Sequence, residues 1–130
     1  MTDEFSPHFR QFIDQNIQSV AQLEALILLR RDSQRDWDAE EIGRALYIPP
    51  DLAATLLADF GRRGLAKVVV QPNVRYTYQI ADAGVDQLIS EIASAYQDRR
   101  VALISLIYSK PLNKVQTFAD AFRLRKETPP

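Results

Sequence analysis

The apolar residues change their spacing once along the chain, over residues 65–80, and this change limits the folds that the sequence can adopt. Before Leu65 and after Asp82, apolar residues recur at the three- and four-residue intervals of amphipathic helices. Between them, the stretch LAKVVVQPNVRYTYQI alternates with the two-residue period of strands and holds turn residues at positions 71–73. The sequence therefore predicts a mostly α-helical fold with one small β-hairpin.

Two of the helices expected before the hairpin carry start signals. The first helix should cover residues 7–17, and Ser19 with Gln22 has the spacing of a capping box at the start of the second. Asp38 and Glu41 repeat that spacing, in which each of two side chains accepts a backbone N–H from the other residue. A third helix should therefore begin sharply after Asp38.

The fourth helix is expected at residues 49–60, within the stretch IPPDLAATLLADF, and should end near Gly64. Its two prolines suit the first turn of a helix, where a missing backbone N–H costs little. The helical spacing predicts a buried face of five residues, which are Leu52, Ala53, Leu56, Leu57 and Phe60. The stretch contains no lysine, arginine or asparagine.

A long helix is expected after the hairpin, because helical spacing runs from Asp82 to Pro111. If unbroken, this helix would be about 40 Å long at a rise of 1.5 Å per residue. The polar residues QDRR divide it into two apolar parts. We expect the second part, VALISLIY, to pack on a partner chain or on the N-terminal helices, and another amphipathic helix to follow at residues 112–126.

The sequence contains few of the groups that catalysis and metal binding require. It has no cysteine and one histidine, His8, and it has neither a glycine-rich phosphate loop nor a nucleophile elbow. We therefore expect no metal, no cofactor and no enzymatic activity. The apolar runs are too short to span a bilayer and the start MTDEFSP is acidic, so a cytoplasmic protein without membrane contact is expected.

The order helix, helix, turn, helix and hairpin is that of a winged helix-turn-helix. The likeness lies in DAEEIGRALYIPPDLAATLLADFGRRGLAKVVV, most specifically in LLADFGRRGLAKV, which looks like the end of a recognition helix leading into a wing strand. With its flanking N-terminal helices and long C-terminal helix, the chain resembles MarR-like transcriptional regulators over residues 19–108. The resemblance implies a homodimer that binds palindromic double-stranded DNA.

The length of the chain and the resemblance together predict a domain plan. At 130 residues the chain should form a single domain, residues 1–130, and the resemblance implies that residues 19–81 are its winged-helix core. Residues 1–18 and 82–126 are helical extensions that we expect to dimerise. The expected dimer contacts are Phe9, Phe12, Val101, Ile104, Ile107, Phe118 and Phe122.

The DNA-binding residues implied by the resemblance lie in the recognition helix and the wing. These positions are Asp51, Ala54, Thr55, Ala58, Arg62, Arg63, Asn73 and Arg75. Asp51 and the nearby Asp59 are acids, which phosphate oxygens repel, and the alanines can at best touch a thymine methyl group. The formal net charge of the chain is −1, although residues 97–130 hold seven bases against three acids. We therefore expect DNA contact of low affinity or low specificity, with the basic C-terminal residues as a further candidate.

Two alternatives stay open at this point. A winged helix can serve as a protein-docking module, in which case the helix at residues 49–60 would bind another protein instead of DNA. Separately, Tyr76, Tyr78 and Tyr96 can be interpreted as the lining of a small-molecule pocket or as aromatic core residues.

Overall fold

The computed structural model describes residues 5–70 and 73–109, in which six helices and three short strands are assigned. The helices are α1 (Pro7–Asn16), α2 (Val20–Arg31), α3 (Ala39–Leu46), α4 (Pro50–Arg62), α5 (Ala83–Asp98) and α6 (Arg100–Tyr108). The strands are β1 (Asp36–Trp37), β2 (Ala66–Val69) and β3 (Arg75–Tyr78). The predicted fold class, a winged helix-turn-helix that is mostly α-helical, is confirmed, and α3, α4 and the β2–β3 hairpin are its defining part.

The strands form one antiparallel sheet in the order β1–β3–β2. Tyr76 on β3 lies opposite both Trp37 on β1 and Val68 on β2, which fixes the register. The hairpin is confirmed, whereas its turn residues 71 and 72 lie outside the described residues. Strand β1 was not predicted, because two residues within the polar stretch RRDSQRDW are too short to show a strand period.

The predicted helix starts are confirmed by their hydrogen bonds. The side chain of Asp38 accepts the Glu41 N–H at 2.8 Å, and the Glu41 side chain accepts the Asp38 N–H at 3.0 Å. The Ser19 hydroxyl likewise accepts the Gln22 N–H at 3.1 Å. The side chain of Gln22, however, accepts the N–H of Gln18 at 2.7 Å, one residue before the expected position.

The helix expected from residue 82 to residue 111 is interrupted at Arg99, so α5 and α6 are separate helices. Arg99 has φ −138° and ψ 52°, outside the helical region, although its N–H still donates to the Ala95 carbonyl oxygen at 2.7 Å. The break allows α6 to pack against α1. As a result, Leu103 and Ile107 are fully buried in the core of the same chain.

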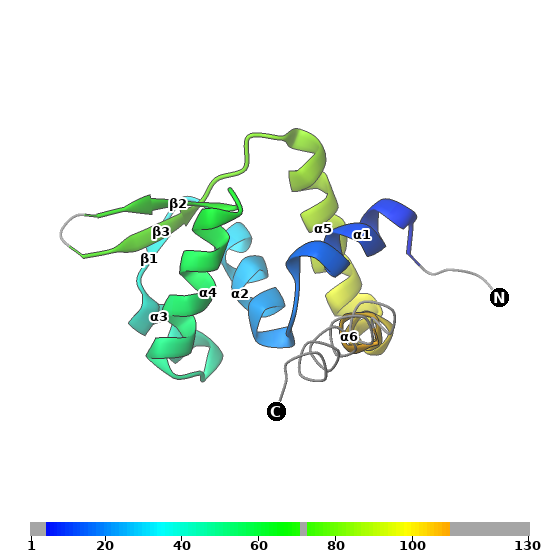
Figure 1. Ribbon diagram of the computed structural model, residues 1–130, viewed down its shortest axis with the longest axis horizontal. Helices are drawn as coiled ribbons and strands as arrows, with labels where there is room; N and C mark the ends of the chain where they lie inside the picture. Colours follow the sequence, from blue (N-terminus) through cyan, green and yellow to red (C-terminus); the bar gives the residue numbers. More distant parts are fainter. Residues whose placement is uncertain (1–4, 71–72, 110–130) are drawn as a thin grey trace, which may run out of the picture.

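The helices lie in two groups around α2 (Figure 1). The sheet, α3 and α4 lie on one side, and α1, α5 and α6 lie on the other. A continuous apolar core joins both groups, from Phe9 and Ile13 in α1 through Leu26 in α2 to Leu57 and Phe60 in α4. Within the described part of the chain, no helix combines the length and the apolar character needed to cross a bilayer.

Candidate nucleic-acid interface

The surface of α4 that faces away from the core is formed by small side chains and one acid. Asp51, Ala54 and Thr55 are exposed, and Ala58 is half-buried. The Thr55 hydroxyl donates to the Asp51 carbonyl oxygen at 3.1 Å, so the single hydroxyl donor among these four is used within the helix. What this surface offers a ligand is therefore mainly methyl groups, together with the Asp51 carboxylate.

One of the five residues predicted to be buried in this helix lies at the surface instead. Ala53, Leu56, Leu57 and Phe60 are buried as predicted, whereas Leu52 is 41% exposed. Leu52 lies at the edge of the buried stripe of α4, since the next residue, Ala53, is fully buried. It adds an apolar side chain to the exposed end of α4.

The turn between α3 and α4 is tight and presents an aromatic ring. A Cβ atom at Gly43 would lie 2.8 Å from the Ile48 carbonyl oxygen, so only glycine allows the chain to pass this close. Tyr47 follows with φ 59° and ψ 45°, a left-handed conformation that costs a residue with a Cβ atom about 1 kcal/mol. Its side chain is 94% exposed and so gains no burial in return.

The C-terminal end of α4 is held by a polar cluster centred on Asp59. The Asp59 carboxylate accepts from Arg62 at 2.9 Å, from Arg63 at 2.7 Å and from the Gln22 side-chain amide at 2.9 Å. Arg63 also donates to the Gln15 carbonyl oxygen at 2.8 Å and to the Asn16 side chain at 3.2 Å. Asp59 is thus turned toward α2, and its charge is compensated by both arginines expected at the DNA.

Arg75, the expected wing contact, is instead bonded to three acids. Its guanidinium donates to Asp36 at 2.7 Å, to Asp38 at 3.2 Å and to Glu41 at 2.7 Å. Arg35 pairs with the same Glu41 at 3.1 Å and stacks over Trp37. These ion pairs fasten the hairpin to β1 and the start of α3, and they leave Arg75 mostly enclosed.

The rest of the wing and of α3 contributes two cations that are not engaged in this way. Arg44 and Lys67 are exposed, and within residues 5–70 and 73–109 neither takes part in an ion pair or a side-chain hydrogen bond. Asn73 is exposed next to the wing turn. The remaining exposed wing side chains are apolar: Val68, Val70 and Val74.

The residues expected at a dimer interface lie around α1 and α6. Phe9, Phe12 and Ile107 are buried within the one chain, Ile104 is half-buried, and Val101 is 79% exposed. The first three are therefore core residues of the single chain, whereas Val101 is available at the surface. Phe118, Phe122 and most of the basic C-terminal stretch lie outside the described residues.

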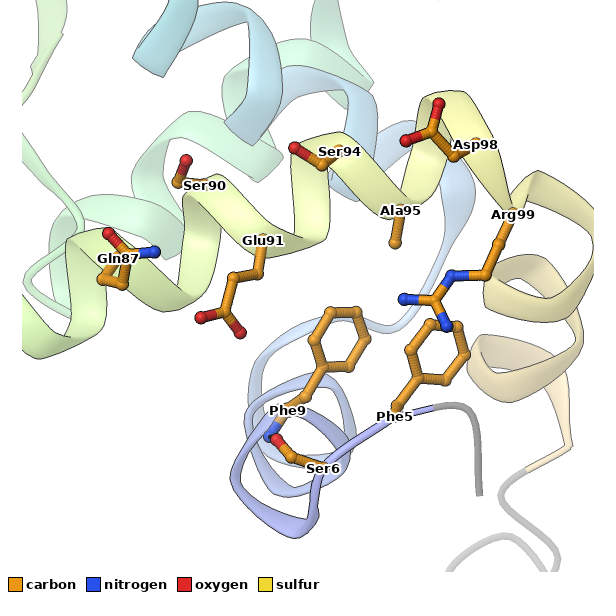
Figure 2. A pocket seen from close by; sticks show the side chains of 10 residues that line it. All are labelled: Phe5, Ser6, Phe9, Gln87, Ser90, Glu91, Ser94, Ala95, Asp98 and Arg99. Atoms are coloured by element: carbon orange, nitrogen blue, oxygen red, sulfur yellow. Dashed lines mark hydrogen bonds between the residues drawn. The ribbon is translucent and has the colours of Figure 1, made fainter. Parts of the chain in front are cut away.

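A cavity of about 390 Å³ lies between the N-terminal segment and α5, on the side away from α4 (Figures 1 and 2). Phe5 and Phe9 stack with their ring centroids 4.5 Å apart, and the Arg99 guanidinium lies 4.7 Å from the Phe5 ring. Polar side chains of α5 form the opposite wall: Gln87, Ser90, Glu91, Ser94 and Asp98. The cavity thus belongs to the region expected to dimerise.

Among the described residues, no cluster of three His, Cys, Asp or Glu side chains is placed to hold a metal.

The tyrosines considered for a small-molecule pocket make separate contacts. The ring of Tyr76 lies 3.4 Å from where a Cβ of Gly61 would be, against α4. Tyr78 donates to Asp86 at 2.6 Å, and Tyr96 donates to Glu24 at 2.6 Å. Burial, followed by the hydrogen bond to Glu24, raises the pKa of Tyr96 to about 12. Tyr96 also lines a cavity of about 340 Å³, together with Tyr47 and residues of α2 and α3.

The sequence did not reveal which side chains pair with the arginines expected at the DNA. Asp36 belongs to no motif, and the capping-box spacing of Gln22 gives no sign of its hydrogen bond to Asp59 on another helix. Asp59 did have a detectable signal, since arginines three and four residues after an acid on a helix are positioned to pair with it.

Comparison with known proteins identifies the fold. No family model matches the sequence, and no curated protein matches it either. The MarR-family transcriptional regulator Sco5413 of Streptomyces coelicolor is 21% identical with a TM-score of 0.53, over 91% of this chain and 80% of that one.

Two further solved structures are similar. One is MepR, a transcription regulator of the Staphylococcus aureus multidrug efflux pump MepA, at 19% identity and a TM-score of 0.50 over 93% of this chain and 91% of that one. The other is the homodimeric winged helix-turn-helix DNA-binding domain of Mb0332 from Mycobacterium bovis, at 18% identity and 0.51 over 75% and 92%. The chain resembles MarR-like and other winged-helix regulators in fold, as its sequence predicts.

Proposed function

We propose that this protein is a winged-helix transcriptional regulator that binds double-stranded DNA with low affinity or low specificity. The observation that carries the proposal is the exposed, small-residue surface of α4 beside the wing, in a fold shared with MarR-family regulators. In such folds the recognition helix enters the major groove and the wing lies along the backbone. Sco5413 and MepR, which are similar in fold, are transcription regulators, and this supports a regulatory role over a catalytic one.

Phosphate contact would come first from the cations that have no partner among the described residues. Arg44 and Lys67 meet this condition, whereas Arg62 would first have to leave its exposed ion pair with Asp59. Arg63, Asn73 and Arg75 remain candidates, although Arg63 and Arg75 would have to give up several hydrogen bonds. Few available cations release few counterions, which is the reason to expect weak binding.

Base contact would rest on methyl groups. Ala54, Ala58 and the methyl group of Thr55 can touch the thymine methyl in the major groove, and Asp51 can accept from a cytosine amino group. A helix face made of small side chains also allows the backbone of α4 to come close to the bases. We therefore expect discrimination by shape and apolar contact more than by hydrogen bonds.

We further propose a homodimer built from residues 1–18 and 82–126, because Val101 is exposed on α6 beside the packed α1. The homodimeric Mb0332 domain supports this assembly, since its fold is similar. Two α4 helices related by a two-fold axis would then meet two half-sites of a palindrome.

Filter binding of labelled random-sequence duplex at about 50 mM and about 200 mM salt tests the proposal. We expect binding at the lower salt that weakens at the higher, and we expect Arg44→Gln and Lys67→Gln each to reduce the affinity and the salt dependence. Arg10→Gln, an exposed cation on α1 on the other side of the molecule, is the matched control and should bind as the unmodified protein does. Absence of binding at about 50 mM salt would reject the function.

A second duplex pair tests the base contact. Alternating A·T duplex should bind about threefold more tightly than the same duplex with uracil in place of thymine, because only the 5-methyl group differs. Equal binding of the two duplexes would show that α4 does not read methyl groups, while leaving DNA binding itself intact.

One group of exposed side chains favours a second candidate, a protein-docking module. Val68, Val70 and Val74 on the wing, with Leu52 on α4, offer apolar surface at positions where a DNA-binding protein gains more from cations. In that case Thr55→Arg and Ala58→Glu would abolish partner binding, and Arg63→Ala would have no effect on it. DNA binding with the salt dependence described above would reject this second candidate.

A further inference from the structure

We propose that Asp59 sets the DNA affinity of this protein by holding Arg62 away from the exposed face of α4. The inference rests on the proposed function, since it concerns the same helix and the same ligand. It explains how a recognition helix that contains an arginine can present a surface without an available cation.

Arg62 belongs by position to the DNA-facing surface. Positions 51, 55, 58 and 62 follow one another at intervals of four, three and four residues, which places them in one stripe along a helix. Arg62 is the one lysine or arginine within α4 (Pro50–Arg62). Its side chain is 70% exposed, so the protein does not bury it. The cation that this stripe would direct at phosphate is therefore Arg62.

Asp59 lies beside this stripe and is held in place. One carboxylate oxygen, Oδ2, accepts from Arg63 Nε at 2.7 Å and from Gln22 Nε2 at 2.9 Å, whereas Oδ1 accepts from Arg62 Nη2 at 2.9 Å. The Asp59 side chain is only 18% exposed. Because Gln22 on α2 and Arg63 hold the carboxylate in place, Asp59 cannot move with the Arg62 side chain when that side chain extends toward DNA. A DNA phosphate must instead compete with Asp59 for the Arg62 guanidinium.

Removal of the Asp59 charge should release Arg62 without releasing Arg63. Arg63 keeps two partners outside this carboxylate, the Gln15 carbonyl oxygen at 2.8 Å and the Asn16 side-chain oxygen at 3.2 Å. Asn at position 59 retains an oxygen that can accept from Gln22. The Asp59→Asn substitution is thus directed at Arg62, whose side chain makes no hydrogen bond other than that to Asp59 among the described residues.

The test compares two substitutions that each remove one negative charge. Asp59→Asn should tighten binding to random-sequence duplex about tenfold at about 50 mM salt, and should steepen the salt dependence by about one phosphate contact per protomer. Glu91→Gln is the control, because Glu91 is exposed on α5, outside the candidate DNA-binding residues, and is not paired with an arginine among the described residues. It should tighten binding by less than about threefold, through the change of net charge alone. An equal gain for both variants would overturn the inference.

A double-mutant cycle then locates the gain. In the Asp59→Asn background, Arg62→Gln should remove most of the tenfold gain, whereas in the unmodified protein Arg62→Gln should change the affinity less than about twofold. A gain in Asp59→Asn that persists without Arg62 would overturn the inference. Thermal unfolding followed by circular dichroism establishes that each variant is folded.

The outcomes separate this inference from the proposed function. If the unmodified protein binds duplex and Asp59→Asn gains no more than Glu91→Gln, DNA binding stands and the role of Asp59 is rejected. If neither the unmodified protein nor Asp59→Asn binds, both are rejected. If Asp59→Asn fails to fold, Arg62→Gln alone decides: a loss of affinity above about twofold in the otherwise unmodified protein would show that Arg62 already contacts phosphate.

Discussion

Arg75 and Asp59 show that the neighbours of a charged residue decide its role. Sequence position alone places Arg75 in a wing and Arg63 at the end of a recognition helix, where both look like phosphate ligands. In the structure, Asp36, Asp38 and Glu41 surround Arg75, and Asp59 pairs with Arg63. Their partners come mostly from other elements, which are brought together only by the tertiary fold.

Tyr47 has a backbone conformation that its own side chain does not favour. We expect Tyr47→Gly to raise the free energy of unfolding by about 1 kcal/mol, because glycine adopts positive φ without a steric penalty. Tyr47→Ala is the control: it removes the exposed ring but keeps the Cβ atom, and should leave stability nearly unchanged. Chemical denaturation measures both. A loss of DNA affinity in the two variants would assign the exposed ring a function that offsets its strain.

Asp86 should make stability depend on pH on the acid side. The hydrogen bond from Tyr78, and then that from Arg30, lower the pKa of Asp86 below its usual value. A carboxylate with a lowered folded-state pKa stabilises the protein above its unfolded pKa of about 3.9, and this contribution is lost as the pH falls through the folded value.

Asp86→Asn should therefore be less stable at neutral pH by about 1 kcal/mol or less, since the Asp86 side chain is 41% exposed. The difference should shrink as the pH falls below about 4. Tyr78→Phe, which keeps the carboxylate but removes its main donor, should reduce the same pH dependence. Urea denaturation across this pH range provides the measurement, and a difference that stays constant with pH would contradict the assignment.

At the scale of elements, local signals located the helix starts and the end of α4 near Gly64, but not the break at Arg99 or the smallest strand. The capping residues Ser19 and Asp38 act within three residues of themselves, so sequence spacing was sufficient to find them. No proline or glycine marks the break at Arg99 in the sequence. The break accompanies the packing of α6 against α1, a tertiary contact that sequence spacing does not show. Strand β1 exists through its pairing with β3, which is distant in sequence.

The capping box of α3 should contribute measurably to stability. Asp38→Ala removes the acceptor for the Glu41 N–H and also one partner of Arg75, so we expect a loss of at least about 1 kcal/mol. Glu40→Gln is the matched control, because Glu40 is an exposed acid of the same helical turn outside the box. It should cost less than about 0.5 kcal/mol. Thermal unfolding would contradict this expectation if the two variants lost equal stability.

At the scale of the molecule, the fold was predictable and the functional surface less so. The change from helical to strand period and back is a property of the whole chain, and it was enough to predict the winged helix-turn-helix fold. The candidate site depends on which side chains remain unpaired after folding. Arg44 and Lys67 were not selected from the sequence, and both are exposed and form no ion pair among the described residues.

The proposed dimer gives a prediction at this scale. Val101→Glu should place a charge in the interface beside α1 and shift the protein toward a 14.8 kDa monomer at micromolar concentration. Val74→Glu makes the same change on the wing, away from α6, and should leave the dimer intact. Sedimentation velocity distinguishes the two species. A monomeric unmodified protein would reject the dimer itself.

Trp37 gives the molecule an optical property that follows from its place in β1. It is the single tryptophan of the chain, it is buried, and the Arg35 guanidinium lies 3.6 Å from its ring centroid. Its strand pairs directly with β3 of the wing. Intrinsic emission excited at the indole band therefore reports on one place only, the base of the wing, and any ligand that moves the hairpin can be followed in solution without attaching a dye.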